Sequence, residues 1–204
     1  MPKKIKIEAD TSTEEKIKEA ARKVFMQKGY AATRTRDIAE ESGINLALLN
    51  YYFRSKEKLF NQVMMEKIQQ LFGVLLPVLN DPSTKLETKI ELIVSNYIDM
   101  LSENPDLPLF VLSEMKGYSE QVRKVLPVEK ITQNISFMQQ LHKKRPGINP
   151  IHFLMNILGM TIFPFVAKPA FSLIGLTNKN ELETILNERK KLIPVWVNAM
   201  LKAK

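Results

Sequence analysis

The chain has 204 residues, 45% hydrophobic and 25% charged, which is typical of a soluble globular protein with room for one large or two modest domains. Its formal charge of +8 and pI near 9.5 favour a polyanionic partner. The sequence contains no cysteine, which excludes disulfides, thiolate metal sites and thiol nucleophiles and is compatible with a cytoplasmic location.

Four helices are predicted in the first third of the chain. Residues 1–12 are expected to form a flexible basic arm. A signal peptide is not expected there, because no apolar stretch follows the basic residues. Ser12 fits a capping box at the start of the first helix, and Gly29 should end that helix. A second short helix is predicted from about Thr35 to Ser42, and Gly43 supplies the turn that follows.

The third predicted helix, roughly residues 45–52, combines a narrow apolar face with many hydrogen-bonding side chains. Leu49 and Phe53, four residues apart, would anchor it inward. The remaining side chains are expected outward or at the edges of that face: Asn45, Leu46, Ala47, Asn50 and Tyr51. Ser55 can cap a longer fourth helix.

The rest of the chain lacks alternating strand patterns, so an all-α fold is predicted. Helices are expected over residues 86–101, 129–144 and 179–202, the last bent by Pro194. One side of this last helix carries apolar residues, namely Leu182, Ile185, Leu186, Ile193, Trp196 and Met200. Residues 151–176 are nearly apolar all round, but polar residues and prolines interrupt the 20-residue stretch that a membrane span requires. A helix covered by its own domain and by a partner subunit explains this segment better than a membrane span.

The segment Gly29–Leu59 contains, in this order, Gly29-Tyr30, Ala32-Thr33, Arg36-Asp37-Ile38-Ala39, Gly43-Ile44, Leu49, Tyr52-Phe53 and Ser55-Lys56-Glu57. In these residues and their spacing it resembles the DNA-binding domain of TetR-family transcriptional regulators. The resemblance implies a three-helix helix-turn-helix domain over residues 13–60, with the helix-turn-helix itself at 34–53. It also implies a larger helical effector-binding and dimerisation domain over residues 61–204, and a homodimer whose paired third helices enter successive major grooves.

Within this resemblance, individual residues suit particular contacts with DNA. Asn50 has the groups for a bidentate pair with adenine, and Leu46 or Ala47 suits contact with a thymine methyl, although Leu46 also fits packing. Asn45 is expected to cap the third helix and to present its amide to DNA. Phosphate contacts are expected from the residues Thr35, Arg36, Tyr51, Tyr52 and Lys56. The two tyrosines fit the edge of the core equally well.

In the C-terminal part, aromatic and methionine side chains are candidates for an effector pocket, or for plain core. The pocket candidates are Tyr97, Phe110, Met115, Phe137, Met138 and Phe153. The dimer-interface candidates, from the 151–167 and 179–202 segments, are Met155, Leu158, Ile162, Ile185, Ile193 and Trp196.

The predicted function is that of a homodimeric repressor released from a palindromic DNA operator by a small hydrophobic effector. The alternative is a DNA-binding regulator without a small-molecule effector, acting constitutively or through a protein partner. The sequence contains no paired carboxylates in a plausible site, nucleophile triad, phosphate-binding glycine loop or metal-ligand set. An enzyme, a metal site, a cofactor and membrane insertion are therefore not expected.

Overall fold

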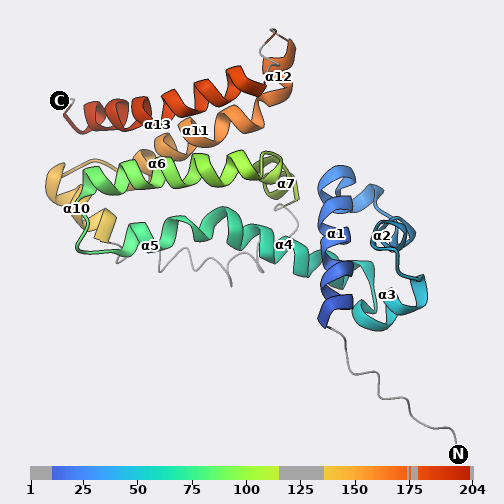
Figure 1. Cartoon of the computed structure of the whole chain (residues 1–204). Helices are drawn as coiled ribbons and strands as arrows, with labels where there is room; N and C mark the ends of the chain where they lie inside the picture. Colours follow the sequence, from blue (N-terminus) through green and yellow to red (C-terminus); the bar gives the residue numbers. More distant parts are fainter. Residues whose placement is uncertain (1–10, 115–135, 174, 176–178, 203–204) are drawn as a thin grey trace, which may run out of the picture. The chain divides into compact units, whose positions relative to one another are not determined.

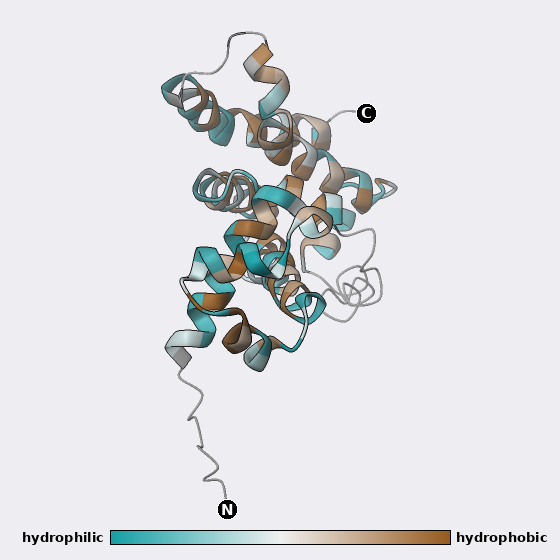
Figure 2. Cartoon of the chain, turned by 90° about the vertical axis from the view of Figure 1, so that its right-hand side faces the viewer, coloured by the Kyte–Doolittle hydropathy of each residue, from teal (hydrophilic) through white to brown (hydrophobic). Residues whose placement is uncertain are grey.

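Helices make up every regular element of the computed structural model in the residues that it describes, 11–114, 136–173, 175 and 179–202 (Figure 1). The chain divides into two units, residues 1–67 and 68–204, and the division falls inside α4 (Lys56–Gly73). Teal and brown residues alternate along the helices, as expected of helices with one buried face (Figure 2). None of the described helices combines the length and apolarity needed to cross a membrane.

The first unit contains α1 (Thr11–Ala32), α2 (Thr35–Ser42), α3 (Leu46–Phe53) and the first part of α4. Its core contains fully buried apolar side chains from all four helices, among them Ile17, Phe25, Ile38, Leu49, Leu59, Phe60 and Met64. The rings of Phe25 and Phe60 meet edge to face with centroids 4.8 Å apart, and the Tyr30 ring lies 4.7 Å from that of Phe60. Apolar burial of this kind contributes about 1.5–3 kcal/mol per large side chain, and it fixes α1 against α4.

Two glycines break the helical path in this unit: Gly43 ends α2 as predicted, whereas Gly29, predicted to end the first helix, lies at a kink inside α1, which continues to Ala32. Gly29 interrupts the regular helix of α1 with φ 71° and ψ 173°. Gly43 follows α2 in the left-handed region at φ 67°, where its N–H donates to the carbonyl of Glu40, and the next N–H, of Ile44, donates to that of Ala39. A side chain with Cβ is strained at this φ. Gly43 therefore sets the sharp turn between α2 and α3.

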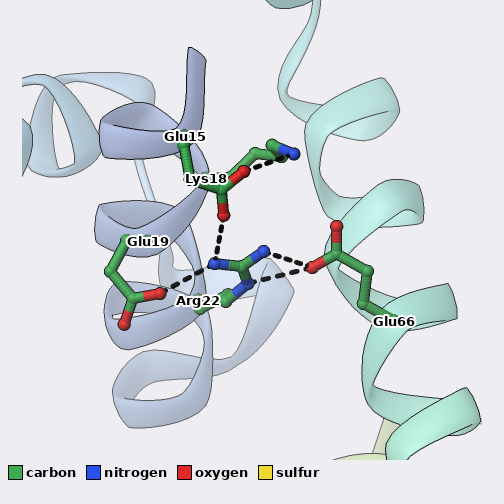
Figure 3. Close-up of polar contacts among 5 residues, drawn as sticks. All are labelled: Glu15, Lys18, Glu19, Arg22 and Glu66. Carbon is green, nitrogen blue, oxygen red and sulfur yellow. Dashed lines mark hydrogen bonds and ion pairs between the residues drawn. The ribbon is translucent and has the colours of Figure 1, made fainter. Parts of the chain in front are cut away.

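A network of ion pairs centred on Arg22 joins α1 to α4 (Figure 3). The guanidinium donates to one carboxylate oxygen of Glu66 through both Nε (2.9 Å) and Nη2 (2.6 Å). On its own helix, Arg22 also pairs with Glu15 at 2.8 Å and Glu19 at 2.7 Å, and Lys18 pairs with Glu15 at 2.7 Å. Paired Arg22 thus supplements the apolar contact between the two helices with a polar one.

The second unit is a helical bundle built around α6 (Leu86–Glu103). Against α6 pack α5 (Leu75–Asn80), α10 (Ser136–Lys144), α11 (Pro150–Val166) and α13 (Lys179–Lys202), and Figure 1 shows α6, α11 and α13 side by side. Two shorter helices, α7 (Leu107–Glu114) and α12 (Lys168–Leu173), pack against α11.

The predicted helices at 86–101 and 179–202 are confirmed. Of the predicted helix at 129–144, residues 136–144 are helical and residues 129–135 lie outside the described part. The segment 151–176 begins as α11, whose helix ends at Val166 before α12 starts. α13 remains helical through Pro194. Its buried residues are Leu186, Ile193, Pro194, Val197 and Leu201. Trp196 is 40% exposed, because it precedes Val197 by one residue and so points about 100° away from it around the helix.

Lys89 and Tyr97 are among the polar side chains buried in this unit. Lys89 has no exposed surface, and its Nζ donates a 3.1 Å hydrogen bond to the carbonyl of Leu79 at the end of α5. Burial lowers the pKa of Lys89, against the opposing effect of the nearby Asp81 carboxylate. The hydroxyl of buried Tyr97 donates to the carbonyl of Leu71, and burial raises the pKa of that phenol.

Candidate nucleic-acid interface

The third helix is held from inside by two side chains and begins at a side-chain cap. Leu49 is fully buried and Phe53 is 3% exposed, as predicted from their spacing. Asn45 occupies the N-cap, where its Oδ1 accepts a 2.8 Å hydrogen bond from the N–H of Leu48, which confirms the predicted cap. α3 therefore starts at a defined residue and presents a defined face.

The exposed face of α3 runs through Ala47, Asn50 and Tyr51, and its spacing continues to Arg54 just beyond the helix. These positions recur at i, i+3, i+4 and i+7, so they follow one side of a helix. Tyr51 is 58% exposed, and its ring meets the edge of the Tyr52 ring with centroids 5.5 Å apart. Of the predicted contact residues, Tyr52 and Leu46 are half-buried and lie at the margin of this face.

The start of α2 lies beside the start of α3. Arg36 lines a shallow hollow together with Gly43, Asn45 and Leu46. Thr35, the first residue of α2, is half-buried. A major-groove reading helix needs such a partner to fix its angle, and the short turn at Gly43 supplies this geometry.

A reciprocal pair of hydrogen bonds caps α2. The backbone N–H of Arg34 donates to the carboxylate of Asp37 at 2.9 Å, and the N–H of Asp37 donates to the carbonyl of Arg34 at 3.0 Å. The Arg34 hydrogen bond, followed by Lys28 at 3.3 Å, lowers the pKa of Asp37. The carboxylate of Asp37 therefore caps α2 and pairs with Lys28.

Lys56 has an internal role that the sequence did not indicate. Its Nζ donates 2.9 Å hydrogen bonds to the carbonyls of Tyr30 and Thr33, and it lies 4.1 Å from the centroid of the Tyr30 ring. These partners are 26 and 23 residues away in the sequence, so no local spacing reveals them. The start of α4 is thereby held against the link between α1 and α2.

Arg54 is the one described non-glycine residue with positive φ, at φ 60° and ψ −35°. It follows α3, and its N–H donates to the carbonyl of Asn50 at 2.9 Å. A side chain at this φ is strained, and such strain concentrates at functional sites. The sequence pattern gave no signal for this conformation.

In the second unit, the predicted pocket residues lie within the core. Tyr97, Phe137 and Phe153 are at most 1% exposed, Phe110 is 5% exposed and Met138 is 9% exposed. The rings of Phe137 and Phe153 have centroids 6.2 Å apart. Met115 lies outside the described residues.

The predicted interface residues divide between surface and core. Met155 is 62% exposed and Trp196 is 40% exposed, and Leu158, Ile162 and Ile185 are half-buried. Ile193 is fully buried within its own unit, because it lies on the inward line of α13, so it adds nothing to an exposed face.

Comparison with known proteins agrees with this geometry. The model of the family "Bacterial regulatory proteins, tetR family" matches residues 17–63. The chain is 26% identical over 163 residues to the probable HTH-type transcriptional regulator YttP of Bacillus subtilis, a match covering 76% of this chain and 78% of that protein. Residues 17–63 therefore form a DNA-binding domain of the TetR type. With this domain the chain is a DNA-binding transcriptional regulator of the TetR type.

Solved structures of transcriptional regulators share the fold of this chain at low sequence identity. The fatty acid degradation regulator FadR from Bacillus halodurans aligns with a TM-score of 0.62 and 17% identity, covering 87% of this chain and 92% of that chain. FadR from Bacillus subtilis, solved in complex with stearoyl-CoA, aligns with a TM-score of 0.53 and 18% identity, covering 88% and 96%. These likenesses show that the chain shares its helical fold with both regulators.

Proposed function

We propose that this chain is a homodimeric repressor that reads a two-fold-symmetric DNA operator with α3. The observation that carries the proposal is the exposed face of Ala47, Asn50 and Tyr51 on a short helix anchored from behind by Leu49 and Phe53. In helix-turn-helix proteins, such a helix lies in the major groove, and dimers read half-sites one turn apart, about 34–36 Å. Asn50 reads adenine and Ala47 contacts a thymine methyl.

The second copy is proposed to bind on exposed apolar residues of α11 and α13. On α11, Ile151 is 43% exposed and Met155 62%. On α13, Leu192, Val195 and Trp196 are 41%, 63% and 40% exposed. Their spacing places them along one side of each helix, and an apolar face of this kind favours an interface with another protein surface.

The repressor is proposed to leave its operator when a small hydrophobic effector binds the domain of residues 61–204. The buried aromatic side chains at 97, 110, 137 and 153 supply apolar surroundings for such a ligand. The stearoyl-CoA complex of the structurally similar Bacillus subtilis FadR supports a ligand with a long apolar chain. Effector binding would favour a state in which the two α3 helices no longer match the spacing of one DNA turn.

Selection of duplexes from a random-sequence library by the purified chain tests DNA reading directly. Enrichment of a two-fold-symmetric sequence is expected. Asn50→Ala should then lose about 1–3 kcal/mol of discrimination at one base pair of each half-site, because a bidentate pair is removed. Failure to enrich any duplex would refute the proposed function.

The effector is tested separately by thermal shift with saturated fatty acids and their acyl-CoA thioesters of graded chain length. A bound ligand at 100 times its Kd raises the unfolding free energy by about 2.7 kcal/mol and so raises the Tm. The same compound should release the selected duplex. If no compound does either, the alternative of a regulator without a small-molecule effector is favoured.

A further inference from the structure

The cations of the first unit fall into two groups by their partners. Those along α1 are mostly paired with carboxylates: Lys18 with Glu15, Arg22 with three glutamates, Lys23 with Glu41 at 2.5 Å, and Lys28 with Asp37. Lys16 is the exception on that helix.

The second group flanks the reading helix. Among the described residues, Arg34, Arg36, Arg54 and Lys58 are exposed and form no ion pair. Arg34 and Arg36 stand at the start of α2, Arg54 directly after α3, and Lys58 in the first turn of α4. Unpaired exposed cations are available to neutralise phosphates, because no internal bond has to be broken first.

Lys56 links the start of α2 to the start of α4, and its ammonium group is already engaged in hydrogen bonds within the fold. Its ammonium group has three N–H donors, and two of them are used on the carbonyls of Tyr30 and Thr33. The carbonyl of Thr33 directly precedes Arg34, so this bond joins the start of α2 to the start of α4, between Arg54 and Lys58. Releasing the ammonium for a phosphate would leave two carbonyls without their donor.

We propose that Lys56 is a positioning residue and that Arg34, Arg36, Arg54 and Lys58 make the phosphate contacts beside α3. The partner is duplex DNA, and the inference rests on the proposed function. Arg54 continues the exposed side of α3 at the i+7 position from Ala47, and the surrounding fold keeps its backbone in a strained conformation at that point. Glu57, exposed in the same turn as Lys58, keeps this region from being uniformly basic.

The test is the salt dependence of binding to the duplex that the wild-type chain selects. A plot of log K against log salt has a slope of about −0.9 per neutralised phosphate. Arg54→Gln and Lys58→Gln should each make the slope shallower by about 0.9 per protomer, or about 1.8 for a dimer. Lys56→Met should weaken binding at every salt concentration and leave the slope unchanged. Lys85→Gln, which removes an exposed cation at the N-cap of α6, is the matched control and should change neither quantity.

The outcomes separate the inference from the proposed function. If the wild-type chain selects no duplex, the proposed function fails. If it selects one and Lys56→Met makes the slope shallower while its Tm stays at the wild-type value, Lys56 is a phosphate ligand and the inference is overturned. Should Lys56→Met not fold, the other two variants still decide: unchanged slopes in Arg54→Gln and Lys58→Gln overturn the assignment of the phosphate contacts.

Discussion

Lys89 is buried, and its ammonium group donates a hydrogen bond to one backbone carbonyl, that of Leu79. Its pKa in the folded chain is lowered by burial, whereas in the unfolded chain it is about 10.4. Between these two values the unfolded state binds more protons, so the stability associated with Lys89 rises with pH toward the unfolded pKa and falls as pH drops through the folded pKa.

Replacing this residue tests that account. Lys89→Met removes the buried charge but also the hydrogen bond to Leu79, which is worth about 1 kcal/mol. Because the charge costs more to bury, the variant should be about 1 kcal/mol more stable than wild type at pH 7. This advantage should shrink as the pH approaches 10.

Urea unfolding of both proteins from pH 7 to 10 measures this difference. Lys85→Met, which changes an exposed lysine at the start of the same helix, should show no such trend. A Lys89→Met variant that is less stable than wild type by the same amount at every pH would show that the hydrogen bond outweighs the charge.

At Arg54, a single substitution is expected to stabilise the fold and to weaken DNA binding. Arg54→Gly removes the side chain from a left-handed backbone conformation, which should raise the unfolding free energy by about 1 kcal/mol. Arg54→Ala keeps the backbone strain and removes the same guanidinium, so its stability should stay near wild type. Both variants should bind the selected duplex more weakly. Chemical denaturation checks the first part, and equal stabilities for Gly and Ala would argue against strain at this position.

At the scale of elements, the α1–α4 pair depends on Glu66, the one α4 carboxylate among the described partners of Arg22. Glu66→Gln should lower the unfolding free energy by about 1 kcal/mol, a modest value because the Glu66 side chain is 37% exposed. Glu19→Gln removes a pair within α1 whose carboxylate is 73% exposed, and it should cost less than about 0.5 kcal/mol. Urea unfolding of both variants gives the comparison. Equal losses would mean that the network adds nothing specific between the helices.

Helix ends and inward faces were predictable because their causes are local. Gly43 adopts the positive φ that ends α2, Gly29 adopts a positive φ that kinks α1, Asn45 caps α3, and Leu49 and Phe53 point inward at the expected spacing of four. The buried side of α13 was harder to predict, because six consecutive residues, 192–197, are apolar. Periodicity alone then does not choose between neighbouring stripes such as Ile193 and Trp196.

The candidate interface was only partly predictable, for a different reason. The exposed face of α3 follows from periodicity, whereas the role of Lys56 depends on carbonyls at Tyr30 and Thr33 that only the folded chain brings near. The conformation of Arg54 likewise arises from the geometry of the α3–α4 turn, since arginine has no preference for positive φ. Tertiary hydrogen bonds therefore decided which of the basic residues remain available.

At the scale of the whole molecule, the exposed apolar residues of α11 and α13 predict the oligomeric state. Met155→Glu or Trp196→Glu would bury a carboxylate in the proposed interface, and each copy of a symmetric dimer would carry the change. At micromolar concentration, light scattering should give a dimer for the wild-type chain and a mass near 23.5 kDa for both variants.

A change of the same kind elsewhere controls for general effects of the added charge. Leu92→Glu places a carboxylate on α6, where the leucine is 39% exposed, and this variant should remain dimeric. A wild-type mass of a single chain, or dimers that persist in both interface variants, would contradict the proposed interface.

The cap at the start of α3 limits how much sequence information one protomer can extract from DNA. The carbonyl oxygen of the Asn45 amide already accepts a hydrogen bond from the N–H of Leu48, and this bond holds the amide against the start of the helix, so its oxygen and its NH2 group are not free to turn together toward one base. The pairing of an amide with adenine requires an acceptor and a donor together, which leaves Asn50 as the amide on α3 that can make it. A half-site read largely through one such pair distinguishes few genomic positions. As the proposed dimer, the chain would therefore select an operator through two copies of a short half-site and through the shape of the duplex between them.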